Sequence, residues 1–104
     1  MLEKNIEIPR EKIAEFCQGW KITEFALFGS VLRDDFRPDS DIDVLVNFAT
    51  DAKWTLFDHV DMQDELVAIF GRKVDLVSRR GIEHSRNYIR KKAILESAEV
   101  VYAV

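Results

Sequence analysis

Two short apolar runs, residues 23–28 and 42–48, most constrain how this chain can fold. They are too short for buried helices and are typical of strands that pack deep inside a sheet. A helical pattern follows at 55–70, and further short apolar runs lie at 74–77 and 99–103. Strands that alternate with helices predict one domain, residues 1–104, of the α/β or α+β class: a small sheet flanked by helices.

Three helices are expected beside these strands. The first begins at Pro9, which is favourable in an opening turn, and ends near Gly19. The third spans about 83–96. The second, at 55–70, follows a Thr-x-x-Asp sequence that resembles a capping box. Its apolar stripe, the side expected to face the core, would consist of four residues at helical spacing: Leu56, Val60, Val67 and Phe70.

The composition is that of a small globular protein. Apolar residues make up 47% of the chain, which excludes disorder, and no run approaches the ~20 apolar residues of a membrane span. The N-terminus lacks the layout of a signal peptide. The single cysteine, Cys17, suits a reducing compartment, so a cytoplasmic location is expected. Its helical spacing from Ile13 and Phe16 predicts a buried apolar role, with a reactive thiol as the alternative.

The net charge of −4 argues against general nucleic-acid binding, which depends on neutralising phosphates. Residues 79–92 nevertheless contain six basic side chains and one acidic side chain, a local charge of +5. This segment is either a solvated helix face or a docking surface for an acidic partner or for nucleotide phosphates. Its basic residues are Arg79, Arg80, Arg86, Arg90, Lys91 and Lys92, and its acidic residue is Glu83.

A candidate phosphate-binding turn follows the first apolar run. Gly29 lets the backbone turn tightly and approach an anion closely. Ser30 offers a hydroxyl and an N–H group at the start of a helical turn, where unpaired donors favour phosphate. Arg33, one turn further on, would stabilise negative charge on the phosphates.

A candidate metal-binding pair opens the second apolar run. Asp41 and Asp43 lie two residues apart, so on a strand their carboxylates share one face. Close carboxylates repel unless a cation lies beside them, and Mg²⁺ prefers such oxygen ligands. Asp75 is the third candidate, because a charge inside the short apolar run 74–77 needs a reason. Three carboxylates can hold two metal ions, with Asp75 nearest the attacking hydroxyl as ligand or general base.

Together these residues resemble the DNA polymerase β-type nucleotidyltransferase superfamily: Gly29-Ser30, ten residues, Asp41-x-Asp43, and Asp75 downstream, with Arg33 between. The small size is similar to that of its minimal nucleotidyltransferase (MNT) domain proteins. The resemblance implies a mixed sheet flanked by helices, a nucleoside triphosphate on the Gly-Ser turn and two Mg²⁺ ions on the three aspartates. It also implies transfer of a nucleoside monophosphate to an acceptor hydroxyl. Asp34 departs from the pattern, since relatives often have glycine there.

The chain is too short to carry a separate acceptor-binding domain, so a partner or a second copy must supply that site. The resemblance implies an antitoxin that transfers AMP from ATP to a tyrosine of a HEPN ribonuclease toxin. Two alternatives stay open: a nucleotide-binding antitoxin that acts by occlusion alone, and a stand-alone transferase with a small-molecule acceptor. The motif fixes neither the acceptor, nor the base, nor the number of nucleotides transferred.

Overall fold

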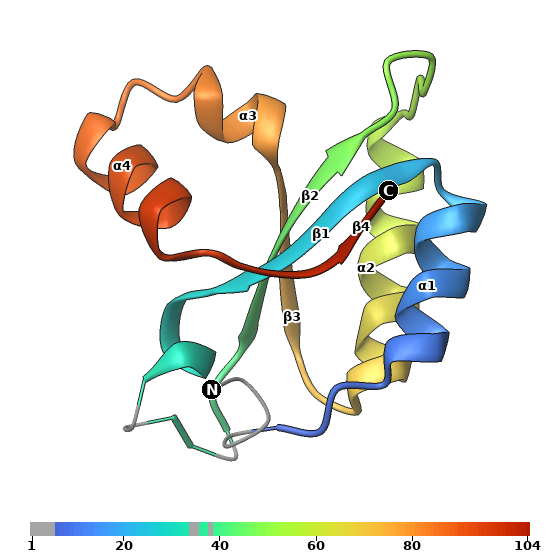
Figure 1. The fold of residues 1–104 in the computed structure, drawn as a ribbon, viewed down its shortest axis with the longest axis horizontal. Coiled ribbons are helices and arrows are strands. Elements are labelled where there is room, and N and C mark those ends of the chain that lie inside the picture. The colour runs from blue at the N-terminus through green and yellow to red at the C-terminus, as the bar shows by residue number, and fades with distance from the viewer. Residues whose placement is uncertain (1–5, 34–35, 38) are drawn as a thin grey trace.

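The computed structural model describes residues 6–33, 36–37 and 39–104. Within these residues, four strands form one mixed sheet in the order β3-β2-β1-β4 (Figure 1). β1 pairs antiparallel with both β2 and β4, whereas β2 and β3 are parallel. The expected mixed sheet is therefore confirmed, and β3 and β4 are its edges. The strands are β1 (Ile22–Phe28), β2 (Ile42–Phe48), β3 (Val74–Ser78) and β4 (Glu99–Ala103).

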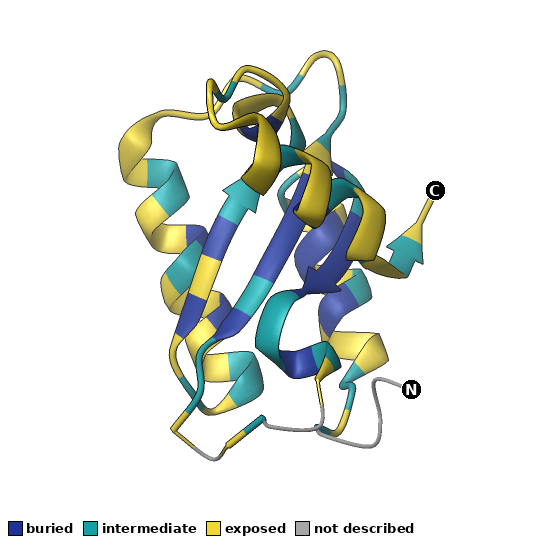
Figure 2. Ribbon diagram, turned by 90° about the vertical axis from the view of Figure 1, so that its left-hand side faces the viewer, coloured by how far each residue is buried: buried dark blue, intermediate teal, exposed yellow. Residues whose placement is uncertain are grey.

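Helices lie on both faces of the sheet (Figure 1). α1 (Arg10–Gly19) and α2 (Leu56–Phe70) cover one face, and α2 makes the crossover that the parallel β2–β3 pair requires. α3 (Arg79–Glu83) and α4 (Tyr88–Ser97) lie on the other face, toward the viewer in Figure 2. A short 3₁₀ helix, η2 (Gly29–Leu32), follows β1 directly. No helix among the described residues is long and apolar enough to span a membrane.

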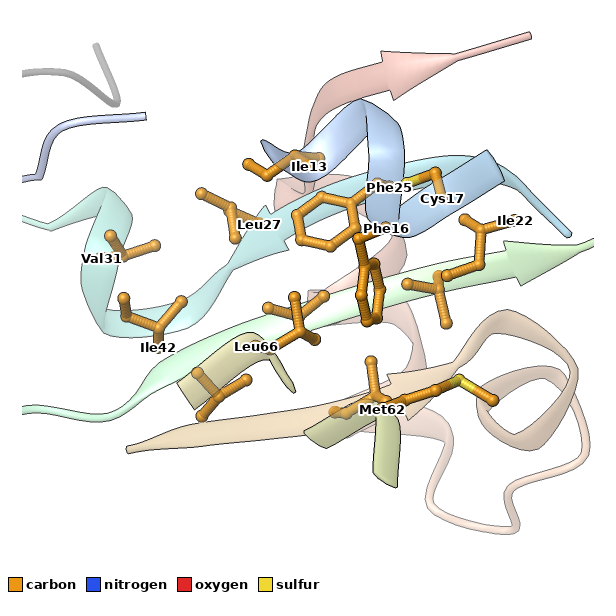
Figure 3. Packing of buried hydrophobic residues seen from close by; sticks show 14 residues of the cluster. Ile13, Phe16, Cys17, Ile22, Phe25, Leu27, Val31, Ile42, Met62 and Leu66 are labelled. Atoms are coloured by element: carbon orange, nitrogen blue, oxygen red, sulfur yellow. The ribbon is translucent and has the colours of Figure 1, made fainter. Parts of the chain in front are cut away.

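The main core lies between the sheet and the pair α1 and α2 (Figure 3). Phe16 of α1 meets Phe25 of β1 edge to face, with ring centroids 6.3 Å apart. Cys17 is fully buried in this core, and burial raises the pKa of its thiol to about 12, which confirms the apolar role. A smaller cluster on the other face anchors α3 and α4 through Ile82 and Ile94.

The described strands begin and end within one residue of their expected positions, and the Thr55–Asp58 capping box of α2 is confirmed. The single helix expected at 83–96 is wrong. Two helices occur instead, because two polar side chains each cap the N-terminus of a separate helix. Ser78 accepts a hydrogen bond from the Gly81 N–H and begins α3, and Asn87 accepts one at the start of α4. Asp34 lies outside the described residues.

The expected inward face of α2 is also wrong. Met62 and Leu66 are the residues of α2 that lie buried in the core, whereas Leu56, Val60 and Val67 are 78%, 50% and 36% exposed. Phe70 is partly buried against the core, as expected. The error has a physical cause: α2 carries apolar side chains on two adjacent faces, and helical spacing alone does not say which one packs inward.

Adjacent residues of α2 provide a test of this orientation. We expect Leu66→Ala to lower the free energy of unfolding by about 2–5 kcal/mol, because it empties part of the core. Val67→Ala should change it by less than about 0.5 kcal/mol, since its side chain already faces solvent. Urea denaturation of the two variants measures both values. Equal losses would show that α2 is rotated relative to the structure described here.

Candidate active site

Gly29 is the point where the chain leaves β1 and comes closest to the candidate carboxylates. Its φ of +76° lies in the left-handed region, where a side chain is strained. A Cβ atom at this position would also overlap the carboxylate of Asp43. Two separate constraints therefore favour glycine at position 29: the left-handed backbone turn and the close approach of Asp43.

Ser30 ties the turn to the start of β2. Its hydroxyl donates to the backbone carbonyl of Asp41 at 3.3 Å, and its backbone N–H donates to the Asp43 carboxylate. Arg33 follows at the end of η2, where its N–H donates to the Ser30 carbonyl at 3.0 Å and its side chain is exposed. The turn expected to bind phosphates thus already holds an anionic group, the carboxylate of Asp43.

The parallel pairing of β2 and β3 brings the second and third candidate carboxylates together. Asp43 and Asp75 are direct register partners, so their side chains leave the same face of the sheet. Asp41 precedes Asp43 by two residues, just before β2 begins. Asp75 is exposed, and Asp41 and Asp43 are half-buried. The strand of Asp75 is thus the direct neighbour of the strand of Asp43.

Mutual repulsion marks this group of carboxylates. The pKa of Asp43 is raised, first by burial and then by the negative charges of Asp75 and Asp41. The N–H of Ser30 and the charge of Arg90 act in the opposite direction and lower it. Burial and the neighbouring carboxylates both disfavour the charged form of Asp43, and a bound cation would offset both effects.

Arg90 is a residue of this site that sequence reasoning did not single out. It lies on α4 one turn before Ile94, which is buried against the sheet, so the two residues share the sheet-facing side of the helix. From there its charge reaches Asp43. The only sequence signal for it was the basic segment 79–92, which does not say which cation faces the carboxylates.

The donor set fits Mg²⁺, although the metal geometry is not preassembled. Among the described residues, no three acidic, histidine or cysteine side chains converge as a ready metal cage. Asp41, Asp43 and Asp75 nevertheless supply only oxygen ligands, which is the chemistry that Mg²⁺ prefers. Mg²⁺ usually takes one or two carboxylates and completes its shell with water and substrate phosphates.

The fold and this carboxylate group define the class of protein to which the chain belongs. The profile of the family described as nucleotidyltransferase domain matches residues 10–100, almost the whole chain. The chain therefore belongs to the nucleotidyltransferase domain family, and it is an enzyme of that class. It is similar to a Methanocaldococcus jannaschii protein provisionally named a protein adenylyltransferase, with 34% identity over 88% of this chain and 82% of the relative.

Solved structures place it among the minimal members of the family. One described provisionally as a minimal nucleotidyltransferase is 33% identical over 86% of each chain, with a TM-score of 0.66. A toxin–antitoxin complex with AMP-PNP contains a chain with a TM-score of 0.72 at 20% identity, over 93% of this chain and 75% of its own. A complex of tri-AMPylated Shewanella oneidensis HEPN toxin with MNT antitoxin gives 0.64 at 21% identity, over 100% and 74%. The last two likenesses show the fold.

Two glycines with the same backbone strain test the role of Gly29. Gly29 and Gly71 both have φ near +70°, but only at Gly29 would a Cβ meet Asp43. We expect each alanine variant to lose about 1–2 kcal/mol of stability through the backbone. Only Gly29→Ala should also change the titration of Asp43, read from its carboxyl ¹³C resonance. An unchanged titration in Gly29→Ala would contradict the close approach.

The raised pKa of Asp43, caused first by burial and then by repulsion, predicts a pH-dependent gain in stability from Asp43→Asn in metal-free protein. Because the folded-state pKa is raised, wild type loses stability as pH rises from the unfolded pKa, near 4, through the folded value. The asparagine variant escapes that loss and should be more stable at neutral pH, by about 0.5–1 kcal/mol. Below the unfolded pKa the two should be equal. Urea denaturation in EDTA at pH 3.5 and 7 checks this, and a less stable variant at pH 7 would contradict it.

Proposed function

We propose that this chain is a Mg²⁺-dependent protein adenylyltransferase that transfers AMP from ATP to a tyrosine hydroxyl of a HEPN ribonuclease, and so acts as its antitoxin. The observation that carries the proposal is the register pairing of Asp43 with Asp75 beside the Gly29-Ser30 turn. The provisional name of the Methanocaldococcus relative supports protein adenylylation. The AMPylated HEPN toxin bound to an MNT antitoxin in a structure of similar fold supports the partner.

In this proposal the Gly29-Ser30 turn binds the triphosphate, and the carboxylates bind the metal ions. The backbone of Gly29-Ser30 and the charge of Arg33 bind the triphosphate of ATP. Arg90, which faces Asp43 from α4, adds a second cation near the phosphates. ATP would have to replace the Asp43 carboxylate at the Ser30 N–H, which frees Asp43 for a cation.

The three carboxylates hold the metal and receive the acceptor. Asp41, Asp43 and Asp75 would bind two Mg²⁺ ions, which stabilise charge on the phosphates and lower the pKa of the attacking hydroxyl. Asp75 is the exposed member of the group, so it is the one that an incoming hydroxyl meets first. It accepts the proton of the tyrosine, either directly or through a bound water.

The chemical balance of the reaction follows. The tyrosine oxygen forms a bond to the α-phosphorus of ATP, while the bond from that phosphorus to the α,β-bridging oxygen breaks. Pyrophosphate leaves with the electrons of the broken bond. The products are an AMP–tyrosine diester, pyrophosphate and the proton taken from the hydroxyl.

The proposal is tested with the purified chain, labelled ATP, Mg²⁺ and a candidate HEPN-type ribonuclease. We expect wild type to label that protein, and Asp41→Ala with Asp43→Ala to reduce labelling by about 10³-fold or more, because the ligands that stabilise the transferring phosphate are gone. Glu11→Ala with Glu15→Ala, which removes two exposed carboxylates of α1, is the control and should label normally.

The same pair of variants separates transfer from occlusion. Undiminished labelling by the aspartate double variant would refute the assignment of the site. If wild type protects cells from the partner without labelling it, and the aspartate variant protects equally well, the chain acts by occlusion. Labelling of a small molecule in place of the protein would establish the stand-alone transferase.

A further inference from the structure

The outer side of α2 carries an apolar surface that no part of the described chain covers. Leu56 is 78% exposed, Phe57 83%, Val60 50% and Val67 36%. Leu56, Val60 and Val67 fall at positions i, i+4 and i+11, which form one stripe along the helix, and Phe57 lies beside its start. We call these four residues the α2 apolar face. Exposed apolar residues gathered on one helix side are typical of an interaction surface, whereas isolated ones are not.

The α2 apolar face runs along the β3 edge of the sheet. Gln63 of α2 accepts a hydrogen bond from the backbone N–H of Leu76 in β3, at 3.4 Å, so this flank of the helix faces the edge strand. Val60 and Val67 lie three and four residues from Gln63, one turn away on either side. Asp75 immediately precedes Leu76. Leu76 faces the α2 side of the sheet and Asp75 faces the opposite side, so a molecule resting on the α2 apolar face would have to extend around the β3 edge to reach the carboxylate of Asp75.

The charged residues within α2 itself are all acidic, and Arg80 lies near its first turn, where it lines a pocket with Thr55 and His59. α2 contains four acidic residues and no lysine or arginine. Asp58 belongs to the capping box, and Glu65 accepts a hydrogen bond from the indole of Trp20 at 2.6 Å. Asp61 and Asp64 are exposed, and within the described part of the chain neither forms an ion pair. They rim the α2 apolar face with negative charge.

This charge selects among the molecules that an apolar face could bind. Nucleic acid and anionic lipid surfaces carry negative charge and would be repelled. A second copy docked through the same face about a twofold axis would bring two acidic helices together, which is unfavourable. A protein surface with apolar side chains and a rim of lysine or arginine is complementary in both respects.

We propose that the α2 apolar face is the docking surface for the acceptor protein, which binds it through apolar side chains rimmed by lysine or arginine. The inference rests on the proposed function, because it takes the acceptor to be a ribonuclease. A ribonuclease must offer basic side chains to RNA phosphates, so it carries the charge that Asp61 and Asp64 favour. A partner large enough to extend from α2 around the β3 edge would also reach the opposite face, where Asp75 is exposed.

The first experiment measures the affinity between the purified chain and a candidate HEPN-type ribonuclease by titration calorimetry. We expect Val60→Glu with Val67→Glu to weaken binding at least 10-fold, because two charges enter an apolar contact. Val100→Glu, at a 53% exposed valine of β4, is the matched control and should bind as wild type does. Ile89→Glu, at an 81% exposed residue of the basic segment 79–92, tests the rival surface on α4.

A second pair of variants tests the charge argument. Asp61→Lys with Asp64→Lys should weaken binding at least fivefold, and the remaining affinity should depend less on salt than that of wild type. Glu11→Lys with Glu15→Lys makes the same change of net charge on α1 and should have a smaller effect. Equal losses from both pairs would show a general charge effect and would overturn the assignment to α2.

These measurements separate this inference from the proposed function. If the valine variant binds and labels the partner as wild type does, or if Ile89→Glu alone abolishes binding, the docking surface is wrong and the proposed function stands. If wild type binds through α2 but transfers no AMP, the proposed function fails and the docking surface stands. A third outcome is that wild type is a dimer and the double variant Val60→Glu with Val67→Glu is a monomer. That result would overturn the docking inference in favour of self-association.

Discussion

The parallel pairing of β2 with β3 is the interaction on which the candidate site depends. It places Asp43 against Asp75, and it exists only because α2 carries the chain back across the sheet between the two strands. Apolar burial stabilises this arrangement: Val44 and Leu76 fill the core from the same two strands that hold the carboxylates on the opposite face. Packing on the core face therefore holds two carboxylates close together on the opposite face, although they repel each other.

That repulsion explains the other features of the site. Asp43 is the most constrained carboxylate, because Gly29 allows it to approach the backbone and the Ser30 N–H binds it there. Arg90 contributes the only other attraction to it among the described side chains that affect its pKa. In the metal-free protein these groups partly replace a cation. In the proposed function, a bound cation and a triphosphate would take over both roles, which would couple substrate binding to carboxylate rearrangement.

Much of this could be predicted from sequence, because short apolar runs and a motif at fixed spacing report local structure directly. The four strands, and the positions of Gly29 and Asp43 at their ends, could be predicted in this way. The inward face of α2 could not, since Val60 and Leu66 are equally apolar and only the shape of the core separates them. The position of Arg90 was likewise hidden, because it depends on how α4 packs across the sheet.

The exposure of Asp75 is consistent with the macromolecular acceptor in the proposed function. Sites for small molecules are concave and bury most of the ligand. Asp75 instead lies exposed on an edge strand, beyond which the described residues form no further strand. A small acceptor at the β3 edge would stay open to solvent on that side. A protein that packs along β3 and α2 would cover the edge and exclude water from the reacting atoms. The exposed edge and the apolar side of α2 therefore have one common explanation, since a single docked protein would cover both.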